Sequence, residues 1–264
     1  MSANCWRAAA ERGPAVKSFD IHFDKEGDTM NVLITGAGRR EALCYNLVRR
    51  CLERGDTVIA TVRRPSEALA ELWRADPERL HVLTMDNASS ESVRAAAADA
   101  AKIVPCIDLM INNAVTTSPD CGKEFMQTNL DYIAGVIDVG AVDPLRVIQA
   151  WMPLLEKSAS ALVVNISSEA GSIGACYRTS MIDYAMAKAA LNMATMTLHN
   201  AFADKPALNI LCVHPGWMRT NAGNAEAPLL TYEHAQTLLD LFESKRTDKT
   251  GPVFVDYTGK PYPW

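Results

Sequence analysis

Residues 31–44 read NVLITGAGRREALC, and this stretch gives the first indication of the fold of the chain. The run Asn31–Thr35 is short, apolar and followed by glycine, as expected for a buried parallel strand. After a Gly-rich turn, Glu41–Arg54 carries apolar residues at helical spacing and stops at Gly55, a residue typical of helix ends. A strand, a Gly-rich turn and a helix in this order begin a βαβ unit.

The same alternation continues to the end of the chain. Further strands are predicted at Thr57–Val62, Leu80–Met85, Ile107–Ile111, Ala161–Ile166, Leu208–Val213 and Pro252–Val255. Helices are predicted at Ser66–Ala75, Ser90–Ile103, Pro144–Lys157, Met181–Ala203 and Thr231–Glu243, with an irregular segment from Asn113 to about Val139. The pattern predicts an α/β fold, a Rossmann-type doubly wound parallel sheet of about seven strands in three α/β/α layers. Ligands of such sheets bind beyond the carboxyl ends of the strands.

Residues 30–264 are expected to form a single domain, a size that fits one large core. Residues 1–29 differ, because much of this stretch mixes charge, Gly and Pro with little periodicity. They are interpreted as a flexible N-terminal extension, with an arm that contacts a partner subunit as the alternative.

Composition excludes several classes of function. The 264 residues carry a formal net charge of −5 with dispersed basic residues, so no nucleic-acid partner is expected. The seven cysteines lack any C-x-x-C pair and favour free thiols in the cytoplasm, while the five scattered histidines argue against a metal site. There is no apolar run near the roughly 20 residues of a membrane span, and no secretory signal is expected.

The turn after the first strand is a candidate phosphate loop. Gly36 and Gly38 would let backbone N–H groups approach a pyrophosphate at a helix N-terminus, and Arg39 could add positive charge. Glu41 would repel a pyrophosphate unless its side chain points away. A tight turn without a ligand is the alternative for this loop.

The end of the second strand bears on the choice of cofactor. NAD-binding sheets of this type usually place an acid there, whereas this strand ends in Arg63 and Arg64. Because arginine can pair with a 2′-phosphate, NADP(H) is favoured, and NAD(H) stays possible. The alternative for both arginines is a solvated surface. Asp86, just after the third strand, is either an adenine contact or a polar residue ahead of the next helix.

Tyr184 and Lys188 form a Y-x-x-x-K pair within a predicted helix, so both side chains lie on one helix face. Ser168 lies just after the predicted strand Ala161–Ile166 and precedes Tyr184 by sixteen residues. A tyrosine whose phenolate is favoured by a nearby ammonium can exchange a proton with a substrate oxygen as general acid or base. The alternative is a packed tyrosine beside a snorkelling lysine.

Further motifs complete the pattern. They are Asn112–Val115 (NNAV), Asp138–Val147 (DVGAVDPLRV) and Pro215–Thr220 (PGWMRT). With the Gly-rich turn, Ser168 and the Y-x-x-x-K pair, they resemble the short-chain dehydrogenase/reductase family, and its C-factor-like and carbonyl-reductase-like members in particular. The resemblance covers most of residues 30–264.

The resemblance implies roles for individual residues. Ser168 would bind the substrate oxygen, Tyr184 would act as the acid or base, and Lys188 would lower the pKa of Tyr184 and hold the nicotinamide ribose. The remaining cofactor contacts would come from Ala42, Leu43, Asn113, Ala114, Pro215, Gly216 and Thr220. Ala42 and Leu43 stand where the family has a glycine and its neighbour, as in divergent members.

Three departures from the family pattern surround the expected cofactor site. The phosphate loop is altered, Val115 replaces a glycine, and Gly140 stands where the family usually has its catalytic asparagine. The favoured function is an NADP(H)-dependent oxidoreductase that reduces a carbonyl or activated alkene. The alternative is a catalytically impaired protein that serves as a cofactor-binding, protein-binding or signalling module.

The substrate is expected to be a small, fairly apolar molecule. Candidate pocket walls are Tyr177, Met181, Trp217 and Met218, with core packing as the alternative. The resemblance also implies a homo-oligomer, a dimer or tetramer built on the helices Pro144–Lys157 and Met181–Ala203.

Overall fold

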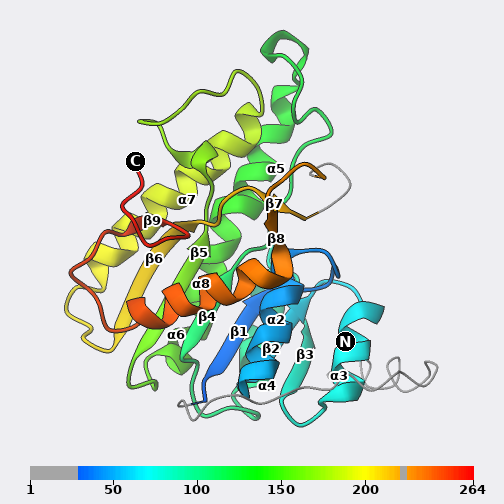
Figure 1. The fold of residues 1–264 in the computed structure, drawn as a ribbon, viewed down its shortest axis with the longest axis vertical. Helices are drawn as coiled ribbons and strands as arrows, with labels where there is room; N and C mark the ends of the chain where they lie inside the picture. Colours follow the sequence, from blue (N-terminus) through cyan, green and yellow to red (C-terminus); the bar gives the residue numbers. More distant parts are fainter. Residues whose placement is uncertain (1–28, 221–224) are drawn as a thin grey trace.

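The computed structural model describes residues 29–220 and 225–264, so nearly all of the predicted N-terminal extension lies outside the described residues. A parallel sheet runs through the centre of the described part (Figure 1). Its strands are β1 (Asn31–Thr35), β2 (Thr57–Val62), β3 (Leu80–Thr84), β4 (Leu109–Asn112), β5 (Ala161–Ile166), β6 (Leu208–His214) and β9 (Phe254–Asp256). The spatial order β3-β2-β1-β4-β5-β6-β9 is doubly wound, which confirms the predicted Rossmann-type fold.

Helices cover both faces of this sheet, as Figure 1 shows. The longer elements are α2 (Leu43–Arg54), α3 (Glu67–Ala75), α4 (Ser90–Ala100), α6 (Asp143–Leu155), α7 (Ile182–Ala201) and α8 (Thr231–Lys245). Successive strand residues point to opposite faces, so Val32 and Ile34 join a core with α2, α3 and α8, whereas Leu33 joins a core with α4 and α6. Leu198 of α7 packs against the second core. The sheet is therefore buried on both sides, which explains its continuous apolar strands.

The segment predicted to be irregular, Asn113 to about Val139, is partly helical. Short 3₁₀ turns at Phe125–Gln127 (η1) and Leu130–Tyr132 (η2) lead into α5 (Ile133–Ile137). A π-helical turn, η3 (Asp138–Val142), then joins α5 directly to α6. In η3 the N–H of Asp143 bonds to the carbonyl oxygen of Asp138.

Smaller differences concern element ends. Helices begin or end up to three residues away from the predicted limits, as at Ala100 instead of Ile103 for α4. The two-residue strands β7 (Met218–Arg219) and β8 (Leu229–Leu230) have no counterpart in the sequence prediction. Within the described residues, no helix combines the length and the apolar character that a membrane crossing requires.

Candidate active site and cofactor cavity

Buried polar side chains fix the ends of β4 and β5 against α7. Asn112 donates from Nδ2 to Oδ1 of Asn165 at 3.0 Å, and Asn165 in turn donates to Oγ1 of Thr195 at 2.9 Å. Ser167 donates to Oδ1 of Asn192 at 2.5 Å. Because these groups are buried, breaking any one pairing would leave an uncompensated polar atom. The network therefore holds α7 in a fixed position beside the end of β5.

The three predicted catalytic residues meet at this junction. Ser168 follows β5, and its side chain hydrogen-bonds that of Tyr184 on the first turn of α7. Lys188 lies one turn further along α7, is 3% exposed, and donates from Nζ to the carbonyl oxygen of Ile166 at 2.6 Å. Its Nζ lies 5.7 Å from the centre of the Tyr184 ring. The sequence spacing thus brings two hydroxyls and one ammonium group together.

Glu169 adds a charge that the sequence analysis did not identify. Its carboxylate accepts a hydrogen bond from the Ser168 hydroxyl and pairs with Arg178. Oε2 of Glu169 lies 3.8 Å from Nδ1 of His214. The hydrogen bond from Ser168, together with one from Arg178, lowers the pKa of Glu169 against the opposing effect of burial.

The protein groups alone do not depress the pKa of Tyr184. Burial raises it, although the hydrogen bond between the Ser168 and Tyr184 side chains works in the opposite direction. Burial also lowers the pKa of Lys188 to about 8. The expectation that Lys188 helps to lower the pKa of Tyr184 when a nicotinamide is bound stays a prediction. Positive charge on a bound nicotinamide is the contribution that would favour the phenolate.

A cavity of about 560 Å³ lies at the carboxyl ends of β1 to β4. Seven of the predicted cofactor residues line it, namely Gly36, Arg39, Ala42, Arg63, Asp86, Asn113 and Ala114. Gly36 has a φ of +73°, and a Cβ atom there would lie 3.2 Å from Cα of Ala114. The glycine therefore keeps the loop close to β4 and leaves the cavity open, as a dinucleotide would require.

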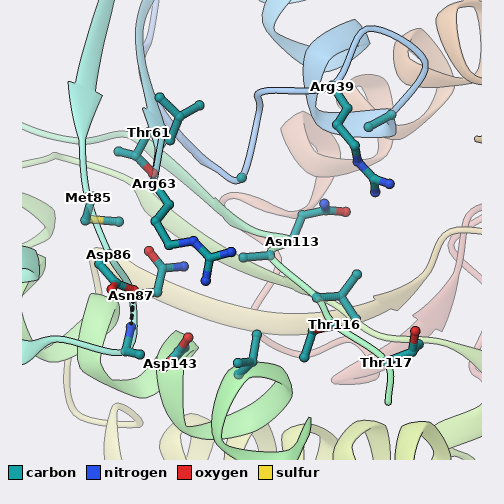
Figure 2. Close-up of a pocket in the computed structure, with 17 residues that line it drawn as sticks. Arg39, Thr61, Arg63, Met85, Asp86, Asn87, Asn113, Thr116, Thr117 and Asp143 are labelled. Atoms are coloured by element: carbon teal, nitrogen blue, oxygen red, sulfur yellow. Dashed lines mark hydrogen bonds between the residues drawn. The ribbon is translucent and has the colours of Figure 1, made fainter. Parts of the chain in front are cut away.

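The four arginines near the cavity are not equivalent. Arg63 and Arg39 line it, and Figure 2 shows the Arg63 side chain extending into it from the end of β2. Arg40 instead pairs with Glu71, and Arg64 is exposed and does not belong to the lining. Glu41 is exposed and outside the lining too, so the predicted repulsion is avoided.

Five other predicted cofactor residues do not belong to the cavity lining. Gly38 accepts a hydrogen bond from Ser66 at its carbonyl oxygen, and Leu43 is buried at the start of α2. The Pro215 carbonyl oxygen lies 2.7 Å from Nε2 of His234, and Gly216 has a φ of +84°. The Thr220 N–H bonds to the carbonyl oxygen of Met218.

The catalytic junction adjoins the cavity at two points. Thr117 lines the cavity, and the N–H of the next residue, Ser118, donates to the Asp183 carboxylate beside Tyr184 at 2.9 Å. Val139 also lines the cavity, and its neighbour Gly140 packs directly on α7. Ser168, Tyr184 and Lys188 themselves do not belong to the cavity lining.

The four predicted substrate walls do not belong to the lining of the cofactor cavity. Tyr177 and Trp217 are 74% and 56% exposed. Met181 precedes α7 and has a φ of +63°, whereas Met218, in β7, packs against the core. Because its side chain packs against this core, Met218 is better interpreted as a core-packing residue than as a wall of a substrate pocket.

Close packing against α7 explains why residue 140 is a glycine. A Cβ atom at this position would lie 2.9 Å from Cβ of Ala187 on α7, which is closer than such atoms approach one another. We predict that Gly140→Ala lowers the free energy of unfolding by about 1–3 kcal/mol, because it forces η3 away from α7. For a chain of this size the midpoint of thermal unfolding should fall by roughly 2–12 °C.

Gly135→Ala is a matched control, because a Cβ atom on this α5 residue would meet nothing within 4 Å. Alanine is the better helix former by up to ~1 kcal/mol, so the control should melt at the same temperature or higher. Equal melting of both variants would contradict the close packing inferred at Gly140.

Comparison with known proteins agrees with this geometry. The family model described as short chain dehydrogenase matches residues 30–228. An uncharacterised oxidoreductase of Schizosaccharomyces pombe is 29% identical over 228 residues, which cover 81% of this chain and 84% of that protein. The C-signal protein of Myxococcus xanthus is 31% identical over 160 residues, which cover 60% of this chain and 93% of that protein.

A solved structure of similar fold is the NADPH-bound carbonyl reductase from chicken fatty liver. It has a TM-score of 0.80 at 26% identity and matches 90% of this chain and 100% of that one. The doubly wound sheet and these matches define the class as an oxidoreductase of the Rossmann type. The chain belongs to the short-chain dehydrogenase/reductase family.

Proposed function

We propose that this protein reduces the carbonyl group of a small, fairly apolar substrate with NADPH. The observation that carries the proposal is the junction of Ser168, Tyr184 and Lys188 beside a cavity lined by Arg63. Two hydrogen-bonded hydroxyls at one point suit a single oxygen atom that must be held and protonated. The NADPH-bound carbonyl reductase of similar fold supports the same assignment.

The residues of the cavity fit a dinucleotide. Gly36, Asn113 and Ala114 would accommodate the pyrophosphate and neighbouring ribose, and Arg63 would pair with a 2′-phosphate. When bound, NADPH supplies the hydride from C4 of its nicotinamide ring. Tyr184 then donates its phenolic proton to the substrate oxygen. Ser168 holds that oxygen by a hydrogen bond after its hydroxyl turns from Glu169 to the substrate. Lys188 stabilises the phenolate that results and is anchored by the Ile166 carbonyl.

Arg63 and Arg64 offer a matched pair for testing the cofactor. We expect Arg63→Ser to weaken NADPH binding by about 10- to 100-fold, since it removes a charge-assisted bond to the 2′-phosphate. NADH binding should change little. Arg64→Ser should leave both affinities near wild type, because Arg64 is outside the cavity lining. Titration of nicotinamide fluorescence measures all four affinities, and equal effects of the two variants would contradict the assignment to Arg63.

A second candidate function is cofactor binding without turnover. Gly140 favours it, because a glycine cannot hold a relay water through a side chain as the family asparagine does. Such a protein would bind NADPH and show no hydride transfer, so binding and transfer must be measured separately.

We further propose that residues 30–264 form one domain that assembles as a cytoplasmic homo-oligomer through α6 and α7. Met186 and Met193 on α7 are 43% and 68% exposed, which leaves apolar surface for a partner copy. The six described cysteines are free thiols, in agreement with a reducing compartment. Light scattering after gel filtration should give a dimer or tetramer, and a monomer would contradict the assembly.

A further inference from the structure

Asp143 is a buried carboxylate in the wall of the cofactor cavity. It begins α6, its side chain is 3% exposed, and it lines the cavity together with Asp86 and Asn87. Figure 2 shows these three side chains at the same end of the cavity. The family motif that Asp138–Val147 resembles has a glycine at this position.

The charge of Asp143 is only partly compensated by protein groups. Its Oδ1 accepts from Nη1 of Arg146 at 2.5 Å, and the same guanidinium donates from Nη2 to Asp138 at 2.8 Å. Burial, with the like charges of Asp138 and Asp86, raises the pKa of Asp143 to about 6 against the opposing effect of Arg146. One arginine is thus shared between two carboxylates, while a third lies across the cavity wall. A hydrogen-bond donor on a molecule in the cavity would therefore stabilise the negative charge of Asp143.

The position of Asp143 shows which part of a dinucleotide it would face. Gly36 and Arg39 lie at the N-terminal end of α2, where the pyrophosphate is expected. Asp86 follows β3, on the far side of β2, where the adenine ring is expected. Asp143 lies at the Asp86 end, so it would face the adenine. The exocyclic amino group of adenine carries two hydrogens, and carboxylates only accept at neutral pH.

We propose that Asp143 is a second acceptor for the adenine amino group, beside Asp86, and that it makes this protein select adenine dinucleotides. The inference rests on the proposed function, because it needs NADPH to bind in this cavity. Asp143 is then a specificity-determining residue for the cofactor and takes no part in the proton transfer at Tyr184.

The test compares NADPH with its reduced hypoxanthine analogue, in which a carbonyl oxygen replaces the adenine amino group. Fluorescence titration should show that the wild-type protein binds NADPH at least about 30-fold more tightly than the analogue. Asp143→Asn should reduce this ratio by about tenfold, because the amide can donate to the carbonyl oxygen. Asp143→Gly, the residue of the family pattern, should reduce it as well.

Asp138→Asn is the control for a purely structural role. It disturbs the same arginine, but Asp138 does not belong to the cavity lining, so the ratio should stay at the wild-type value. Thermal melting verifies that each variant is folded. If Asp143→Asn and Asp143→Gly weakened both ligands equally, the inference would be wrong while the proposed function stood. If the wild-type protein bound neither ligand, the proposed function and the inference would both fail.

Discussion

Tyr184→Phe is expected to lower the rate of carbonyl-dependent NADPH oxidation by about 10²- to 10⁴-fold, the range for loss of a positioned general acid. The variant removes only the hydroxyl that hydrogen-bonds Ser168. NADPH affinity should stay within about threefold of wild type, because one neutral hydrogen bond contributes little net free energy. Steady-state absorbance at the nicotinamide band, with a panel of aromatic aldehydes, ketones and quinones, measures the rate.

Tyr132→Phe is the matched control, since Tyr132 is 42% exposed and lies in η2, outside the cavity lining. It should keep the wild-type rate. If Tyr184→Phe retained more than about a tenth of that rate, another group would have to supply the proton, and the role given to Tyr184 would be wrong.

Lys188→Met should lower turnover by about 10²-fold or more, because an ammonium group no longer stabilises the phenolate of Tyr184. The same change should leave the cofactor-free protein as stable at pH 7 as the wild type, within about 1 kcal/mol. Methionine fills a similar volume, and it removes a charge whose burial is unfavourable. Loss of activity with retained stability separates a catalytic role from a structural one.

The pH dependence of stability gives an independent readout for Lys188. Its pKa is about 8 in the folded protein and about 10.4 in an unfolded chain, so the unfolded state binds more protons between these values. The wild-type contribution of this group to the free energy of unfolding should therefore rise as the pH increases from about 8 to about 10.4. Urea unfolding at pH 7.5 and 9.5 should show this rise in the wild type, relative to Lys188→Met. A parallel pH dependence in both proteins would contradict a depressed pKa.

The sequence was sufficient to predict the sheet and the proximity of Ser168, Tyr184 and Lys188. The limits of β2 and β5 agree with the predicted Thr57–Val62 and Ala161–Ile166, because both runs are apolar and both are buried on two faces. Ser168 and Tyr184 meet because β5 ends beside the start of α7, and that juxtaposition follows from the doubly wound topology.

The helical segment before α6 could not be predicted in the same way. Gly135 and Gly140 are poor helix formers, and Pro144 normally lies near a helix start, so the local signals favoured an irregular chain. Tertiary packing decides the outcome, because η3 lies against α7 with Gly140 beside Ala187. The turn into α6 also places Asp143 in the cavity wall, and no local pattern in the sequence reveals that.

The pKa shifts and ion pairs of the site also could not be predicted from the sequence. The direction of the Tyr184 pKa shift depends on how far the ring is buried and on the carboxylate of Glu169 nearby. Glu169 follows Ser168 in the chain, but Arg178 reaches it from a loop nine residues away. The residue spacing in such a loop predicts neither the distance between Glu169 and Arg178 nor the burial of Tyr184.

Transfer of deuterium from NADPH labelled at C4 is the most direct test of whether this protein reduces a carbonyl group with NADPH. The protein would be incubated with labelled NADPH and the carbonyl panel, and the products examined by mass spectrometry and NMR. We expect deuterium on the carbon that carried the carbonyl oxygen, and none in the products of reactions with Tyr184→Phe. Deuterium at the β-carbon of an enone would reassign the reaction to alkene reduction. Tight NADPH binding without any transfer would contradict the proposed reductase and favour a cofactor-binding module.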